Sequence, residues 1–219
     1  MTYEEIIKNL KSQKNPKNIA GMARFGINPN NTLGISIPYL RKLSKKIGKD
    51  HKLANKLWKS GYHEAKLLAA LVDNSKEVTE KQIESWVKDF DSWDICDMVC
   101  GNLFDKTPFA YTKAFELSKR DKEFVKRTGF VLMAALAVHD KKIDDKKLMK
   151  FFPIIIREAT DERNFVRKAV NWALRQIGKR NSNLKKEAIK TAEIILKKYP
   201  DSKSAQWIAK DAIRELNSK

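Results

Sequence analysis

The chain has 219 residues, 42% of them hydrophobic, and its 45 lysines and arginines against 27 acidic residues give a net charge of +18. This length allows one large domain or two small ones, and we expect a single domain over residues 1–219. Two cysteines are too few for a secreted disulfide framework, and no run of about 20 apolar residues exists to cross a membrane. These features favour a cytoplasmic protein without a signal peptide. The charge favours a polyanionic partner, most often nucleic acid, although a lysine-rich organism would also produce it.

The predicted secondary structure is helical almost throughout, because apolar residues recur at helical spacing and glycine (8) and proline (6) are scarce. A first helix is expected from Ile37, capped by Ser36. Downstream, ranges 51–59 and 62–73 form one predicted helix pair, and 79–90 and 93–104 form the next. Ser92 or Asp91 is the expected cap of the helix that carries Trp93.

Later segments predict helices that repeat along the chain. The stretch EFVKRTGFVLMAALAVHDK, with a helix expected from Phe124, resembles NFVRKAVNWALRQIGKR, with a similar helix expected from Phe165, 41 residues later. NWALRQI (171–177) is echoed by KDAIREL (210–216) after 39 residues. Each is preceded by another predicted helix, at roughly 108–118, 145–158 and 185–198. Helix pairs recurring at about 40 residues predict an all-α superhelical solenoid of HEAT-like repeats, with the second helix of each pair on the concave side.

Two further signals mark the helix expected over 162–178. Asp161 is its predicted cap and Gly178 its predicted end. Lys168, Trp172, Arg175 and Lys179 follow steps of four, three and four, so they form one cationic and aromatic stripe. Such a stripe suits nucleic acid, because cations bind phosphates and a ring stacks on a base or sugar.

The segment DSWDICDMVC (91–100) places Trp93 and Asp97 four residues apart, on one face of a helix. A carboxylate beside a large aromatic ring suits a surface that meets a cation. Asp94 points about 100° away from Trp93 around the helix. It is expected to be solvated or to be a first-turn charge that the helix dipole favours. Structural alternatives stay open: Trp93 and Trp172 as packing residues, and Asp97 as an ion-pair partner of Arg127.

The pieces SWDICD (92–97), FVKRTGFVL (124–132) and FVRKAVNWALRQIGK (165–179) resemble the DNA alkylation repair family, the AlkD-type alkylpurine DNA glycosylases built from HEAT-like repeats. The resemblance runs from about Leu33 to Leu216. It implies hydrolysis of the N-glycosidic bond of N3- or N7-alkylated purines in double-stranded DNA, as in base excision repair.

The resemblance also assigns site residues. Asp97, Trp93 and Trp172 are the expected catalytic residues. The expected DNA-binding residues are Arg127, Lys168, Arg175, Lys179, Arg163 and Arg167. One position differs from the family pattern, which has an aromatic residue, often tyrosine, early in the chain. Here the segment reads GMARFGIN, so Gly21 or Phe25 stands there, and Phe25 has a ring but no hydroxyl.

Other classes of function remain as alternatives: a non-catalytic DNA-binding repeat protein that recognises distorted or branched DNA, and a protein–protein scaffold. No glycine-rich phosphate loop occurs, so no nucleotide cofactor is expected. The histidines lack zinc-ligand spacing, and Cys96 and Cys100 are interpreted as buried thiols, so no metal is expected. The absence of a coiled-coil seam favours a monomer. Trp58, Trp86 and Trp207 are expected in the core.

Overall fold

The computed structural model describes residues 1–218, which form fourteen α-helices and one short 3₁₀ helix without any strand. The chain divides into two compact units, Met1–Thr107 and the part from Pro108 onward. The all-helical prediction is confirmed. The expectation of one domain over residues 1–219 stays a prediction.

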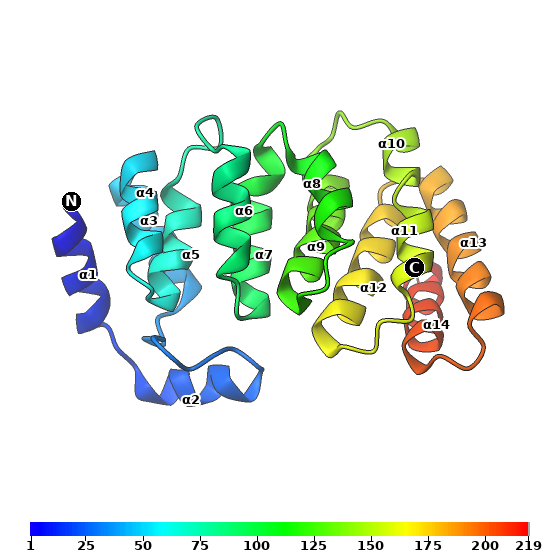
Figure 1. Cartoon of the computed structure of the whole chain (residues 1–219), viewed down its shortest axis with the longest axis horizontal. Coiled ribbons are helices and arrows are strands. Elements are labelled where there is room, and N and C mark those ends of the chain that lie inside the picture. Colours follow the sequence, from blue (N-terminus) through cyan, green and yellow to red (C-terminus); the bar gives the residue numbers. More distant parts are fainter. Residues whose placement is uncertain (219) are drawn as a thin grey trace. The chain divides into compact units, whose positions relative to one another are not determined.

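The first unit is built of helices that pack in two layers (Figure 1). Its elements are α1 (Tyr3–Ser12), α2 (Pro16–Arg24), α3 (Ile37–Ile47), α4 (His51–Lys59), α5 (His63–Val72), α6 (Glu80–Lys88), α7 (Trp93–Asn102) and the 3₁₀ helix η1 (Phe104–Lys106). Helix α5 packs against both α3 and α7, and α1 packs against α4. The predicted pair α4–α5 therefore packs together, both helices of the predicted pair α6–α7 are present, and the second helices α5 and α7 share one layer.

Helix caps and an aromatic cluster hold the other layer of this unit in place. The side chains of Asp50 and Thr79 cap α4 and α6 by accepting the backbone N–H groups of Leu53 and Gln82. The rings of Trp58 and Trp86 stack with centroids 4.0 Å apart and planes 3° from parallel. Both are buried, as predicted, so they join α4 to α6 through their aromatic faces.

The second unit repeats the same construction. Its elements are α8 (Ala110–Leu117), α9 (Glu123–His139), α10 (Asp145–Met149), α11 (Phe152–Glu158), α12 (Asn164–Gly178), α13 (Ser182–Lys198) and α14 (Lys203–Asn217). Helix α12 packs against α9 and α14, whereas α11 packs against α13. The second helices of the three predicted pairs thus lie side by side in one layer, as the repeat requires.

The 41-residue repeat has a direct physical counterpart. The rings of Phe124 and Phe165, which occupy equivalent positions in the two repeats, lie 5.6 Å apart. Within the pair α8–α9, a Cβ added at Gly129 would stand 2.3 Å from the backbone nitrogen of Ser118. Only glycine permits so close an approach, so this residue sets the distance between the two helices.

Three details of the sequence predictions are corrected. Ser36 and Ser92 stand at the N-cap positions of α3 and α7, but neither side chain makes a capping hydrogen bond. The N-cap of α12 is Arg163, and Asp161 instead accepts the backbone N–H of Arg163 at 3.0 Å. Trp207 is 38% exposed and so is not a core residue.

Within residues 1–218, no helix combines the length and apolar character needed to cross a membrane.

Candidate functional site

The beginning of α7 carries Trp93 and Asp97 on one face, and both side chains are half-buried. The indole Nε1–H of Trp93 donates a hydrogen bond of 2.9 Å to the backbone carbonyl of Phe25. This bond joins α7 to the end of α2 and fixes the edge of the ring. The structure therefore brings Phe25, the early aromatic residue of the family comparison, next to Trp93.

Asp94 lies in the first turn of α7, as one of its two predicted roles requires, but the other role, a solvated surface charge, is wrong. Its Oδ2 lies 2.8 Å from Nε2 of His63, a buried histidine at the start of α5, and its Oδ1 accepts the hydroxyl of Ser92 at 2.7 Å. Burial disfavours the charged imidazole, but the hydrogen bond and the charges of Asp94, Glu64 and Asp91 together raise the pKa of His63 above its ordinary value. The His63–Asp94 pair thus holds the helix that carries Trp93 and Asp97.

This pair makes the stability of the first unit depend on pH. Because the pKa of His63 is higher in the folded state, its contribution is complete below the unfolded value of about 6.5 and is lost as pH rises through the folded value. We expect Asp94→Asn to lower Tm more at pH 5.5 than at pH 8.5. Thermal unfolding at both pH values measures this difference, and an equal loss at both would contradict it.

The connection between α2 and α3 is anchored to the starts of α5 and α7. The carboxylate of Glu64 is fully buried and accepts three backbone N–H groups, from Leu33 at 2.8 Å, Gly34 at 2.6 Å and Ile35 at 3.2 Å. The backbone N–H of His63 donates to the carbonyl of Asn31 at 3.0 Å. These bonds hold the connection rigid beside α5.

Two further features define the same connection. Asn28 Nδ2 donates to Asp91 Oδ2 at 2.7 Å, next to the start of α7. Phe25, where the connection begins, has a side chain that is 73% exposed. The sequence analysis missed the anchoring residues Glu64, His63 and Asp94. One signal for Glu64 was present, since this acid begins the segment EAKLLAALV, in which every other residue except Lys66 is apolar.

In the second unit, the predicted stripe on α12 is present. Lys168 and Lys179 are exposed, and Trp172 and Arg175 are half-buried. Arg175 Nη1 and Lys179 Nζ both pair with the carboxylate of Glu215 on α14. Lys168 forms no ion pair within residues 1–218, so it differs from the other two cations of the stripe.

The remaining predicted DNA-binding arginines also contact protein groups. Arg163 Nη2 pairs with Asp161 at 2.5 Å. The guanidinium of Arg167 lies over the exposed ring of Trp207, 5.3 Å from its centroid. Arg127 is 5% exposed and its Nη1 donates to the carbonyl of Phe165 at 2.6 Å. Arg127 therefore connects α9 to α12, a structural role that the sequence did not separate from phosphate binding.

The cysteines and possible metal ligands complete the description. Cys96 and Cys100 are buried in α7, as predicted, and Cys96 Sγ donates to the carbonyl of Ser92 at 3.4 Å. Across residues 1–218, no group of three or more histidine, cysteine, aspartate or glutamate side chains is arranged to hold a metal ion. Trp93 and Asp97 belong to the first unit and the α12 stripe to the second, and their convergence on one ligand stays a prediction.

Layers of paired helices at a 40-residue period define a HEAT-like repeat protein. The family model of the DNA alkylation repair enzyme matches residues 6–216, so the chain belongs to that family. The match covers α7 and α12, which carry the predicted site residues, and it confirms the family resemblance that the sequence indicated.

A solved structure has a similar fold. It is described as "a new family of proteins related to the HEAT-like repeat DNA glycosylases with affinity for branched DNA structures". The similarity has a TM-score of 0.79 at 16% sequence identity and covers 88% of this chain and 83% of that one. Among curated proteins, no sequence matches. The structural similarity confirms the HEAT-like repeat fold.

Proposed function

We propose that this protein is a DNA glycosylase that hydrolyses the N-glycosidic bond of N3- or N7-alkylated purines in duplex DNA. The observation that carries the proposal is the pair Trp93 and Asp97 on one half-buried face of α7, in a chain of the DNA alkylation repair enzyme family. The net charge of +18 supports a DNA substrate, because it attracts the phosphate backbone.

The chemistry suits a carboxylate beside an aromatic ring. An alkylated purine carries a formal positive charge, which already weakens its bond to deoxyribose. As that bond breaks, positive charge develops on the sugar, as in other oxocarbenium-like glycoside chemistry. In the proposed mechanism, Asp97 stabilises this charge and orients the attacking water. The released base takes the bonding electron pair and becomes neutral, and water supplies the hydroxyl of the abasic sugar and loses its second proton to the solvent.

The aromatic residues contribute attraction to the same cation. An indole face attracts a cation by about 0.5–2 kcal/mol, and we assign this role to Trp93. The same role for Trp172 stays a prediction. Such modest stabilisation suffices for a base with a weakened bond but not for undamaged purines. Selectivity then follows from the substrate's own lability, without requiring a closed pocket for the base.

Lys168 is the best candidate for a direct phosphate contact on α12, because the neighbouring cations Arg175 and Lys179 share Glu215. We expect Lys168→Gln to weaken binding to any duplex and to reduce the slope of log affinity against log salt concentration by about one. Fluorescence anisotropy at several salt concentrations measures the slope. Lys190→Gln, at an exposed position on α13, is the control. Equal slopes for the two variants would show that Lys168 does not contact DNA.

The direct test of the proposed activity is base release. Duplex DNA with a single 7-methylguanine or 3-methyladenine is incubated with the purified protein, and the free base is measured by chromatography. We expect release well above spontaneous depurination from both lesions and none from undamaged DNA. Protein-independent release alone would refute the glycosylase proposal.

A second candidate function is binding of branched DNA without base excision. The solved structure with affinity for branched DNA favours it, as does Phe25 at a position where glycosylases of the family often have tyrosine. Comparing affinity for a three-way junction with affinity for a linear duplex of equal length tests this candidate. Tighter binding of the junction together with no base release would support it over the glycosylase.

A further inference from the structure

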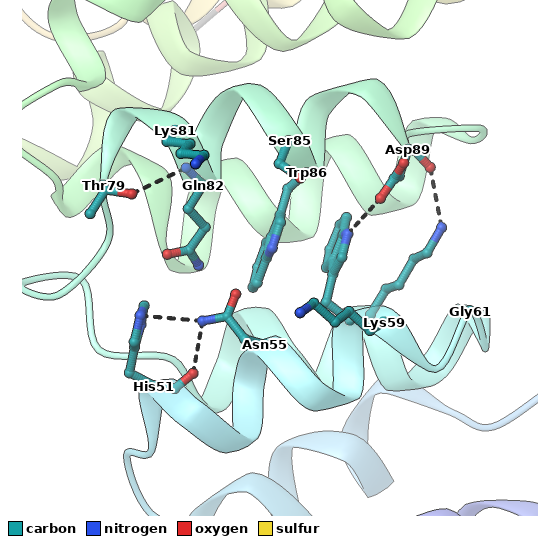
Figure 2. A pocket seen from close by; sticks show the side chains of 12 residues that line it. His51, Asn55, Lys59, Gly61, Thr79, Lys81, Gln82, Ser85, Trp86 and Asp89 are labelled. Carbon is teal, nitrogen blue, oxygen red and sulfur yellow. Dashed lines mark hydrogen bonds between the residues drawn. The ribbon is translucent and has the colours of Figure 1, made fainter.

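The first unit has an open cleft between α4 and α6, in the helix layer that does not contain Trp93 and Asp97 (Figure 2). Its volume is about 610 Å³, within the range of small-molecule sites. The residues that bear on its chemistry are His51, Asn55, Lys59, Lys66, Lys81 and Asp89. None of the residues predicted to bind or process DNA lines this cleft.

The charges in the cleft are unbalanced. Three lysines line it, whereas Asp89 is its one carboxylate, and Asp89 Oδ2 accepts the indole N–H of Trp58 at 2.9 Å. Lys66 Nζ lies 5.5 Å from the Trp58 ring centroid and donates to the carbonyl of Asp89 at 3.2 Å. Lys59 and Lys81 are exposed and form no ion pair within residues 1–218. Two ammonium groups on opposite walls are therefore available to an anion.

A buried carboxylate orients polar side chains at one end of the cleft. Asp73, which is fully buried, binds His51 Nδ1 through Oδ1 at 2.7 Å and accepts Gln82 Nε2 through Oδ2 at 2.6 Å. Asn55 Nδ2 donates to His51 Nε2 at 3.2 Å, and Figure 2 shows this pair at the α4 wall. Asn55 Nδ2 also donates to the carbonyl of His51 at 3.0 Å, so these bonds occupy both ring nitrogens of His51 and the amide donors of Asn55. This end of the cleft is therefore fixed, and the groups left to bind an anion are the lysines.

The floor of the cleft is rigid. The stacked rings of Trp58 and Trp86 lie between the two helices, and each is nearly inaccessible. The spacing of α4 and α6 is thus set by aromatic packing, and the cationic side chains are held at the rim of a preformed groove. A preformed groove with cations at its rim presents a positive potential that attracts an anion.

We propose that the α4–α6 cleft is a phosphate-binding site, separate from the surface that carries Trp93 and Asp97. Lys59 on α4 and Lys81 on α6 bind phosphate oxygens from opposite walls. The phosphate belongs either to a second strand or arm of DNA bound by the same molecule, or to a free nucleotide. The first source rests on the DNA binding proposed above, whereas the second does not.

The test follows the indole N–H resonance of Trp58 in ¹⁵N-labelled full-length protein. The probes are inorganic phosphate, thymidine 5′-monophosphate, single-stranded DNA, linear duplex and a three-way junction. The site variant is Lys59→Gln/Lys81→Gln. The matched control is Lys52→Gln/Lys88→Gln, which removes the same charge from exposed positions on the same two helices but outside the cleft.

We expect a saturable shift of the Trp58 resonance that the site variant abolishes and the control retains. If DNA is the source, the single strand or junction produces the shift, and the site variant lowers the salt slope for that probe by about two relative to the control. If a free nucleotide is the source, only thymidine 5′-monophosphate and inorganic phosphate produce the shift. No saturable shift with any probe, or equal shifts in both variants, would overturn the proposal.

Base release is measured in parallel and is expected to be unchanged in the site variant. Failure of the phosphate-site proposal and failure of the glycosylase proposal are therefore distinguishable.

Discussion

Asp97→Asn is expected to reduce the release of 7-methylguanine from duplex DNA by about 100-fold or more, while the affinity for that DNA changes no more than a few fold. The carboxylate acts on charge that develops only as the glycosidic bond breaks, so its removal raises the barrier without removing contacts to the bound duplex. An amide of the same shape keeps the packing of α7 but carries no negative charge. The loss therefore falls on the chemical step.

The measurement is single-turnover base release with protein in excess, combined with anisotropy titration of the same duplex. Asp91→Asn is the control, because Asp91 is an exposed carboxylate near the start of α7 whose asparagine replacement still accepts the hydrogen bond from Asn28. Full activity in Asp97→Asn would show that the carboxylate takes no part in hydrolysis. A large loss of DNA affinity or of Tm would assign Asp97 a structural role instead.

The repeat architecture was predictable because it follows from local periodicity. The apolar faces at Phe124 and Phe165 recur after 41 residues, and equivalent helices in a stack bury equivalent residues, which is why these two rings meet. Trp207 shows the limit of this reasoning. It lies on the last helix, α14, where the ring remains 38% exposed and contacts Arg167.

The site was predictable only in part. The spacing of Trp93 and Asp97 determines that they share a face of α7, since helical geometry alone relates them. The partners of Asp94 and Trp93 were not predictable, because His63 and the carbonyl of Phe25 are 31 and 68 residues away along the chain. The pairing of Arg175 and Lys179 with Glu215 likewise depends on how α12 packs against α14.

Glu64→Gln is expected to lower the stability of the first unit by about 2–4 kcal/mol, since hydrogen bonds to a charged group contribute roughly 1.5–3 kcal/mol each and at least one is lost. The buried carboxylate accepts three N–H groups from residues 33–35. A glutamine has one carbonyl oxygen, so its NH₂ group must face at least one backbone donor. The connection that runs from Phe25 to α3 then loses its main anchor to α5.

Thermal unfolding is expected to show a Tm lower by roughly 5–15 °C, given about 2–4 °C per kcal/mol for a chain of this size. Native-state hydrogen exchange should show faster exchange at the amides of Leu33, Gly34 and Ile35, with no change in the second unit. Glu77→Gln is the control, because Glu77 is exposed and its replacement keeps an oxygen to accept the hydrogen bond from Asn74. Unchanged exchange at residues 33–35 would contradict the anchoring role of Glu64. Faster exchange together with slower base release would show that the anchored connection supports the surface formed by Trp93 and Asp97.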